Sequence, residues 1–243
     1  MSKKRAELIV ALDVDTLEEA RKLIDALSPA VDIFKVGSQL FTSCGPAAVR
    51  FLQARGKKVF LDLKYHDIPN TVASAVSCAV GLTDAVKATH AESSSLFMLT
   101  LHTVGGKEML EAAVRSVKEK AKAMNIEKPF LVGVTVLTSQ KKDDNTSQLV
   151  IERALLAKEC GLDGVVASSQ EVALIRQKLG ENFLIVTPGI RPTGADAGDQ
   201  KRVTTPKDAI KNGSNFLVVG RPIVEAADPL AAAQNILKEI NIA

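Results

Sequence analysis

Residues 58–71 read KVFLDLKYHDIPNT, and the first half of this stretch carries the pattern on which the fold assignment rests. The run KVFLDLK is short and mostly apolar, β-branched or aromatic, which is typical of a strand in a parallel sheet. Successive side chains of a strand point to opposite faces, so Asp62 and Lys64 share one face while Val59, Leu61 and Leu63 occupy the other. The fold must therefore bury one face of this strand and place charged groups on the other.

Seven further runs of the same kind lie before and after this one. They are residues 8–14, 32–37, 96–102, 130–138, 163–168, 183–190 and 215–221. A helical pattern follows each run, for example at 17–27, 106–124 and 228–240. Eight alternating strand and helix units are what a (β/α)8 TIM barrel requires, so we predict an α/β fold with a single barrel domain over residues 1–243. An open, doubly wound sheet would normally carry a glycine-rich turn after its first strand, where this chain reads LDVDT (12–16).

The composition argues against several functional classes. The 243 residues are 46% hydrophobic, and Lys plus Arg exceed Asp plus Glu by only 31 − 28 = 3, with the basic residues scattered along the chain. This balance does not suggest a nucleic-acid partner. Cys44, Cys78 and Cys160 have neither zinc-site nor disulfide spacing. No apolar stretch approaches a membrane span and no signal-peptide core follows the basic start, so we expect a soluble, cytoplasmic protein without a membrane partner.

Polar residues recur where the predicted strands end, which is where barrel enzymes build their active sites. They are Asp13, Lys35, Asp62, Lys64, His102, Thr138, Ser139, Arg191, Gly220 and Arg221. Each taken alone is more often a helix cap or a solvated side chain. Together, Asp62 flanked by Lys35 and Lys64 would alternate in sign, which buried charges need in order to offset desolvation. His66, His90 and His102 lack metal-ligand spacing, so we expect hydrogen-bonded structural roles and no metal site.

The last two strands carry a second signal, because TPGIRP (187–192) and VVGRPI (218–223) each place an arginine after a strand. Barrels commonly bind phosphate at this point. Backbone N–H groups near Gly220 and the planar guanidinium of Arg221 are suited to a phosphate dianion. The polar loop 194–201 between these two segments contains two glycines, which is compatible with a lid over the ligand.

Six segments resemble those of orotidine 5'-phosphate decarboxylases of the bacterial type. They are ALDV (11–14), DLKYHDIPNT (62–71), VTVLTS (134–139), TPGIRP (187–192), AGDQKR (197–202) and VVGRP (218–222). Two segments depart from the family pattern. Residues 82–97 form a longer connection than expected, and LTLHTVGG (99–106) stands where the family more often has a sequence of the Asn-Val-His-Ala type.

The resemblance implies a carboxy-lyase that converts orotidine 5'-monophosphate to UMP and CO2 in pyrimidine biosynthesis, without a metal or an organic cofactor. It implies that Lys64 protonates the C6 carbanion beside Asp62, and that Lys35 and Asp13 reach the ribose. It also implies a homodimer with shared active sites, in which each chain contributes Asp67, Ile68 and Thr71 to the site of its partner. The catalytic residues that it implies are Lys35, Asp62, Lys64 and Asp67. The remaining substrate-binding residues that it implies are Thr138, Ser139, Arg191, Gln200, Gly220 and Arg221.

Two alternative functions remain open at this point. Related barrels that decarboxylate or condense sugar phosphates with Mg²⁺ also contain Asp-x-Lys-x-x-Asp, but they lack the continuation Ile-Pro-Asn-Thr found here at 68–71. Sensitivity to EDTA separates them from a metal-independent enzyme. A barrel that only binds nucleoside monophosphates would keep Gly220 and Arg221 but would not need Lys35, Asp62 and Lys64 together. A turnover assay tests that alternative.

Overall fold

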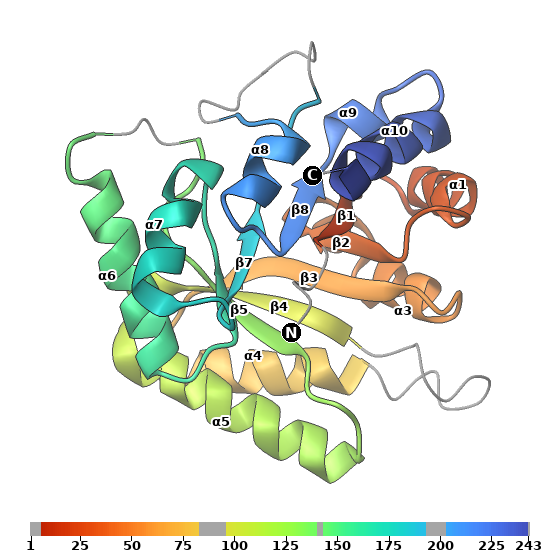
Figure 1. The fold of residues 1–243 in the computed structure, drawn as a ribbon. Coiled ribbons are helices and arrows are strands. Elements are labelled where there is room, and N and C mark those ends of the chain that lie inside the picture. The colour runs from red at the N-terminus through yellow and green to blue at the C-terminus, as the bar shows by residue number, and fades with distance from the viewer. Residues whose placement is uncertain (1–5, 83–95, 140–142, 193–202, 243) are drawn as a thin grey trace.

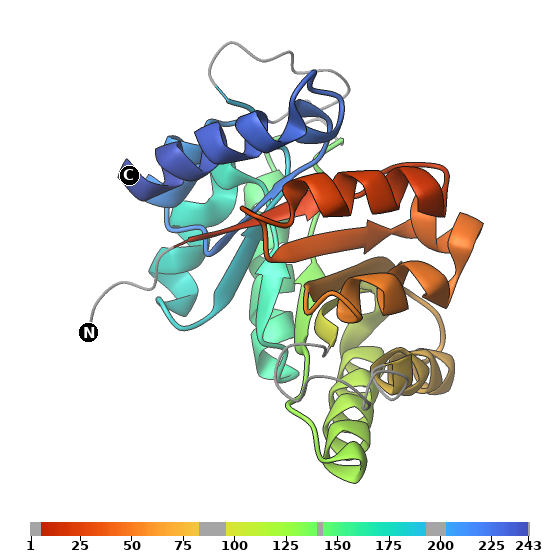
Figure 2. The ribbon, with the colours of Figure 1, turned by 90° about the vertical axis from the view of Figure 1, so that its right-hand side faces the viewer.

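The computed structural model describes residues 6–82, 96–139, 143–192 and 203–242. In these residues eight parallel strands form a closed barrel in chain order, which confirms the predicted fold class. The strands are β1 (Glu7–Ala11), β2 (Ile33–Gly37), β3 (Lys58–Tyr65), β4 (Leu96–His102), β5 (Phe130–Val134), β6 (Gly164–Val166), β7 (Leu184–Thr187) and β8 (Phe216–Val219). Helices surround the barrel (Figures 1 and 2).

The helices follow the strands as the sequence pattern predicts, with short additional helices after β2 and β8. They are α1 (Leu17–Leu27), α2 (Ser38–Cys44), α3 (Pro46–Gln53), α4 (Pro69–Gly81), α5 (Gly106–Met124), α6 (Thr146–Glu159), α7 (Ser169–Leu179), α8 (Pro206–Lys211), α9 (Arg221–Val224) and α10 (Pro229–Ile242), with a 3₁₀ turn η2 (Thr103–Gly105) before α5. None of the described helices is long and apolar enough to cross a membrane.

Local sequence signals set the ends of the two helices whose predicted bounds are confirmed. Thr16 and Glu19 form a capping box at the start of α1, in which each side chain accepts a hydrogen bond from the other residue's backbone N–H. Asn125, with a left-handed backbone (φ 53°), ends α5 after Met124. α10 begins at Pro229 because Asp228 caps it through the N–H of Ala231 at 3.0 Å.

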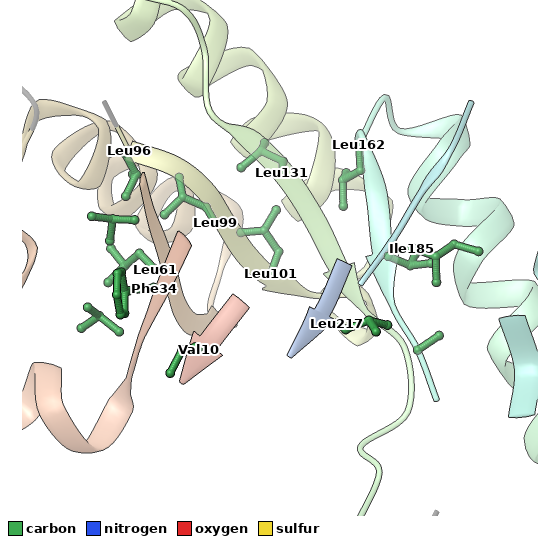
Figure 3. Close-up of a cluster of buried hydrophobic side chains, with 14 of the residues drawn as sticks. Val10, Phe34, Leu61, Leu96, Leu99, Leu101, Leu131, Leu162, Ile185 and Leu217 are labelled. Atoms are coloured by element: carbon green, nitrogen blue, oxygen red, sulfur yellow. The ribbon is translucent and has the colours of Figure 1, made fainter. Parts of the chain in front are cut away.

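The barrel has an inner and an outer apolar core because alternate strand residues point to opposite faces. The inner cluster fills the barrel with residues such as Ile33, Phe60 and Met98. The outer cluster joins the strands to the helices, and Figure 3 shows part of it, with Leu61 and Leu99 among the labelled side chains. On β3, Phe60 and Leu61 therefore face opposite cores, which agrees with the alternation read from the sequence. Asp62 follows on the inner face.

Five strands end earlier than predicted, and residues beyond them form the loops of the site. β1, β5, β6, β7 and β8 stop at Ala11, Val134, Val166, Thr187 and Val219, although the predicted runs continue for two to four residues. A last backbone hydrogen bond follows some of these ends, such as Leu12 N to Lys35 O at 3.0 Å and Thr135 N to Val166 O at 3.2 Å, and loops begin beyond it. Asp13, Thr138 and Arg191 consequently lie in loops beyond their strands, and Arg221 opens α9.

Candidate active site

The carboxyl ends of the strands surround a cavity of about 500 Å³. The predicted site residues that line it are Asp13, Lys35, Asp62, Lys64, Thr138, Arg191, Gly220 and Arg221. Four other predicted residues, Asp67, Ile68, Thr71 and Ser139, are exposed and do not line the cavity of the same chain. Gln200, the loop 194–201 and most of the connection 82–97, including His90, lie outside the described residues.

Four charged side chains form a row across this cavity in which the sign alternates. Lys35 Nζ donates to Asp13 Oδ1 at 3.0 Å and lies 3.6 Å from Asp62 Oδ2. Lys64 Nζ donates to the same Asp62 oxygen at 2.9 Å. Lys35 and Asp62 are only 9% and 8% exposed, so each would carry a large desolvation cost without an opposite charge beside it. The structure thus contains the alternation that the strand positions suggested.

The carboxyl group of Asp62 is held in its ionised form. Burial alone would raise its pKa, but the positive charges of Lys35 and Lys64 and the hydrogen bonds from Lys64 and Thr100 lower the pKa below its usual value. Its two oxygens have different partners, because Oδ2 faces the two ammonium groups and Oδ1 accepts from Thr100 Oγ1 at 3.0 Å. A fixed negative charge is therefore present at neutral pH in the centre of the cavity.

Lys64 has an unusual backbone for a strand residue. Its φ angle is 51°, in the left-handed region that non-glycine residues seldom adopt. The pairing of β3 with β4 is also irregular here, since it shifts between Leu61 and Tyr65. Strained backbone of this kind is concentrated at functional sites, where the surrounding structure fixes it. The position of the Lys64 ammonium is therefore determined by a local distortion that the sequence pattern of β3 does not predict.

Thr100 is a site residue that the sequence reasoning did not identify. It is fully buried on β4 and its hydroxyl contacts both Asp62 and the backbone of Lys64. A signal existed, because Met98, Thr100 and His102 alternate on β4, which makes Thr100 a polar residue on the inner face. Gln39 was also missed. It lines the cavity mouth from α2 and donates to Asp15 Oδ1 at 2.7 Å.

Two arginines line the cavity beyond β7 and β8. Gly189, with φ 75°, allows the tight turn that leads to Arg191. Arg191 is 9% exposed, its backbone N–H donates to Thr204 O at 2.9 Å, and its guanidinium donates to Ile190 O at 3.0 Å. Arg221 follows Gly220 directly at the start of α9. The two cations give this side of the cavity the charge and donors that an anionic group needs.

The two described histidines lie together at the ends of β3 and β4. The ring centroids of His66 and His102 are 5.8 Å apart. Burial first, and then the neighbouring His66, Lys64 and Arg153, lower the pKa of His102. No group of three or more His, Cys, Asp or Glu side chains suited to a metal ion occurs within residues 6–82, 96–139, 143–192 and 203–242.

The fold and this row of charges can be compared with known proteins. A sequence model of the orotidine 5'-phosphate decarboxylase / HUMPS family matches residues 6–236. The chain belongs to this family. The resemblance seen in the sequence motifs is therefore confirmed over most of the chain, since the orotidine 5'-phosphate decarboxylase / HUMPS model covers nearly all of its barrel.

Several relatives are named orotidine 5'-phosphate decarboxylases. The orotidine 5'-phosphate decarboxylase of Moorella thermoacetica is 49% identical over 245 residues, covering 97% of this chain and 92% of the relative. That of Geotalea daltonii is 46% identical over 244 residues, covering 97% and 96%. Among solved structures, the orotidine 5'-phosphate decarboxylase of Lactobacillus acidophilus has a TM-score of 0.80 at 37% identity, covering 98% of this chain and 99% of that one.

Proposed function

We propose that this protein is an orotidine 5'-phosphate decarboxylase, a carboxy-lyase that converts orotidine 5'-monophosphate to UMP and CO2 in pyrimidine biosynthesis. The observation that carries the proposal is the buried carboxylate of Asp62 between the ammonium groups of Lys35 and Lys64. Decarboxylases named as such are 43–49% identical to the chain over nearly its whole length, which supports the same conclusion. The substrate is thus a small nucleotide and not a nucleic acid.

Lys64 is the proton donor in this proposal. The bond between C6 of the pyrimidine and the carboxylate carbon breaks, CO2 leaves, and the electron pair remains on C6. No neighbouring π-acceptor can delocalise that pair, so a positive charge fixed in advance must stabilise it. The Lys64 ammonium supplies this charge and then transfers one proton to C6, which gives UMP.

Asp62 acts on the ground state of the substrate. Its ionised carboxylate lies beside the substrate carboxylate, and the repulsion between them disappears when neutral CO2 forms. The hydrogen bond from Lys64 to Asp62 Oδ2 brings the proton donor to the same place. The reaction requires a fixed negative and a fixed positive charge side by side, which is the arrangement of these two residues.

The other predicted substrate-binding residues bind the nucleotide away from the reacting carbon. Lys35 and Asp13 reach the ribose, and Thr138 with Ser139 contacts the pyrimidine or phosphate side. The phosphate is bound by Arg191, Gln200, Gly220 and Arg221. Binding energy from this distant group can lower the chemical barrier because it holds the substrate carboxylate against Asp62. The same residues therefore affect the chemical step and the affinity.

A second copy of the chain completes each site in this proposal. Asp67, Ile68 and Thr71 lie outside the cavity of their own barrel, and the Ile68 side chain is 66% exposed. An exposed isoleucine next to a charged residue suits a homodimer interface at which each chain contributes these residues to the neighbouring site. We further propose that the enzyme acts in the cytoplasm as this homodimer.

The Mg²⁺-dependent sugar-phosphate enzymes are less well supported as an alternative. Asp62 Oδ2 faces two ammonium groups, at 2.9 Å and 3.6 Å. These charges already neutralise the carboxylate, and a divalent cation in contact with them would be repelled. We therefore propose a reaction without metal or organic cofactor, in which Lys64 supplies the electrostatic stabilisation.

The test is the ultraviolet absorbance of orotidine 5'-monophosphate mixed with catalytic amounts of protein and excess EDTA. Rapid loss of the orotate chromophore, with UMP as the product, is expected. Activity that EDTA abolishes and Mg²⁺ restores would favour the sugar-phosphate group of enzymes. A folded protein that binds UMP but leaves the chromophore unchanged would contradict the catalytic assignment of Asp62 and Lys64.

A further inference from the structure

The pairing of β3 with β4 contains an irregularity opposite a single residue. Leu61 pairs with Leu99 and Tyr65 pairs with Leu101, so four steps along β3 span two steps along β4. Thr100 is the residue of β4 between the two pairs. On β3 the irregular segment contains Asp62 and Lys64, the two residues proposed to act on the substrate carboxylate. A bulge next to a reactive residue commonly redirects its side chain.

The hydroxyl of Thr100 occupies this irregularity with both of its hydrogen-bonding functions in use. Lys64 N donates to Thr100 Oγ1 at 2.8 Å, and Thr100 Oγ1 donates to Asp62 Oδ1 at 3.0 Å. A backbone N–H can only donate, so the oxygen accepts from Lys64 and its own hydrogen is directed at the carboxylate. One buried hydroxyl thus links the backbone of the proton donor to the neighbouring carboxylate.

We propose that Thr100 is a positioning residue for decarboxylation, whose hydroxyl fixes the orientation of the Asp62 carboxylate and the left-handed backbone of Lys64. This inference rests on the proposed function of the site. A left-handed non-glycine residue is strained and persists only where its surroundings determine it. Thr100 accepts the Lys64 N–H at the bulge, and it occupies the Asp62 oxygen that does not face the ammonium groups. Without the Thr100 hydroxyl, the Asp62 carboxylate and the Lys64 backbone can adopt other orientations, and the reaction depends on their fixed geometry.

Three variants test the proposal. Thr100→Val keeps the branched shape of the side chain and removes the hydroxyl, whereas Thr100→Ser keeps the hydroxyl. Thr103→Val is the matched control, because Thr103 is also buried but its hydroxyl donates to Val134 O at 2.8 Å and contacts neither Asp62 nor Lys64. We would measure kcat and KM for orotidine 5'-monophosphate, the Kd of UMP and the thermal midpoint of each variant, and the crystal structure of Thr100→Val.

The expected result is a separation of kcat from binding. Thr100→Val should lower kcat about tenfold or more, with KM and the UMP Kd changed less than about threefold, because the lost bonds orient reactive groups and do not touch the phosphate. Thr100→Ser should recover most of this loss, and Thr103→Val should keep kcat within about twofold of the parent even if its thermal midpoint falls.

Three outcomes would overturn the inference. They are an unchanged kcat in Thr100→Val, an equal loss of kcat in Thr100→Ser, and an equal loss in Thr103→Val. The proposed function fails separately, through absence of turnover by the unaltered protein. In that case the crystal structure decides the positioning role. A Lys64 backbone that leaves the left-handed region in Thr100→Val supports the inference, and an unchanged Lys64 and Asp62 contradict it.

Discussion

The ammonium group of Lys35 lies next to the backbone of Gly37, so a Cβ atom at position 37 would be only 2.8 Å from Lys35 Nζ. It would also lie 3.3 Å from Asp13 Oδ1, the oxygen that accepts from this ammonium. The backbone of Gly37 (φ −95°, ψ −176°) is accessible to any residue, so the space and not the backbone requires glycine here. The missing side chain leaves room for the pair between Lys35 and Asp13.

Gly37→Ala should therefore affect activity without affecting folding. The lysine end is flexible and can move away from a methyl group, but it then loses its position between Asp13 and Asp62. We expect kcat/KM to fall about tenfold or more, while the free energy of unfolding changes by less than about 1 kcal/mol. Steady-state kinetics and urea unfolding measure the two effects. If the Gly37→Ala variant had the kinetics of the parent protein, Lys35 would not need to occupy this position.

Lys64→Ala should nearly abolish turnover, but the variant should still bind UMP. Removing a positioned general acid lowers rates by about 10²–10⁴-fold, and here the stabilising charge is lost as well. Single-turnover kinetics and calorimetric titration with UMP are the measurements. Lys58→Ala is the control, since Lys58 begins the same strand and its ammonium lies 3.9 Å from Glu7 and 5.2 Å from the Phe97 ring, away from the cavity. Substantial activity in Lys64→Ala would mean that another group protonates C6.

Arg221→Ala should lower kcat/KM by roughly 10²–10⁴-fold, the range expected for a bidentate charged contact in which two strong hydrogen bonds are lost. Added guanidinium ion should restore part of the loss because it can occupy the vacated place. The control is Arg21→Ala. The guanidinium of Arg21 lies 4.8 Å from the centroid of the Phe51 ring in the helix layer, so we expect this variant to keep the kinetics of the parent protein. An Arg221 variant with normal kcat/KM would place the phosphate elsewhere.

The stability that Asp62 contributes should depend on pH in one direction. Its pKa is lowered in the folded protein from a reference value of 3.8, so the folded form resists protonation more than the unfolded form. The stabilisation is therefore complete above this value and is lost as pH falls below it, by up to about 1.4 kcal/mol per pH unit until the folded group titrates.

Urea unfolding of the parent protein and of Asp62→Asn between pH 2.5 and about 6 measures this dependence. The difference in unfolding free energy between them should be constant near the upper end and should shrink below about pH 4, because the asparagine does not titrate. A difference that stays constant over the whole range would show that the Asp62 pKa is the same in the folded and unfolded chains.

Arg176 should be important for stability and not for activity. It is 9% exposed on α7, and its guanidinium donates to the carbonyl oxygens of Gly213, Gly180 and Phe183 at the amino ends of β7 and β8. Arg176→Met would leave several buried acceptors unpaired, so we expect a loss of about 3 kcal/mol or more of unfolding free energy. Lys22→Ala, which breaks an exposed pair with Glu18, is the control and is expected to leave the unfolding free energy nearly unchanged.

Most of the fold could be predicted because its signals are local. The eight apolar runs, the helical patterns that follow them and the absence of a glycine-rich turn after the first strand are all visible in the sequence. The ends of the strands could not be predicted in the same way. Apolar residues continue past Val134 and Thr187 into the cavity wall, and only the pairing of neighbouring strands determines where a strand stops.

The site was predictable where it depends on strand position and was missed where it depends on contacts between strands. Asp62, Lys64 and Lys35 meet because parallel strands end at one side of the barrel. The sequence places Thr100 on the inner face of β4, but its contacts with Asp62 and Lys64 depend on the irregular pairing of β3 with β4. The role of Gly37 depends on the path of the Lys35 side chain. Neither property has a signature in a single strand.

The packed interior of the barrel also determines how the gaseous product departs. Phe60 precedes Asp62 on the inner face of β3, and Ile33, Met98 and Val132 fill the barrel around it. These side chains block passage along the barrel axis beneath the carboxylate. In the proposed reaction carbon dioxide forms beside Asp62 and escapes through the mouth by which the nucleotide entered, so the two products share one exit and whatever covers that mouth controls the release of both.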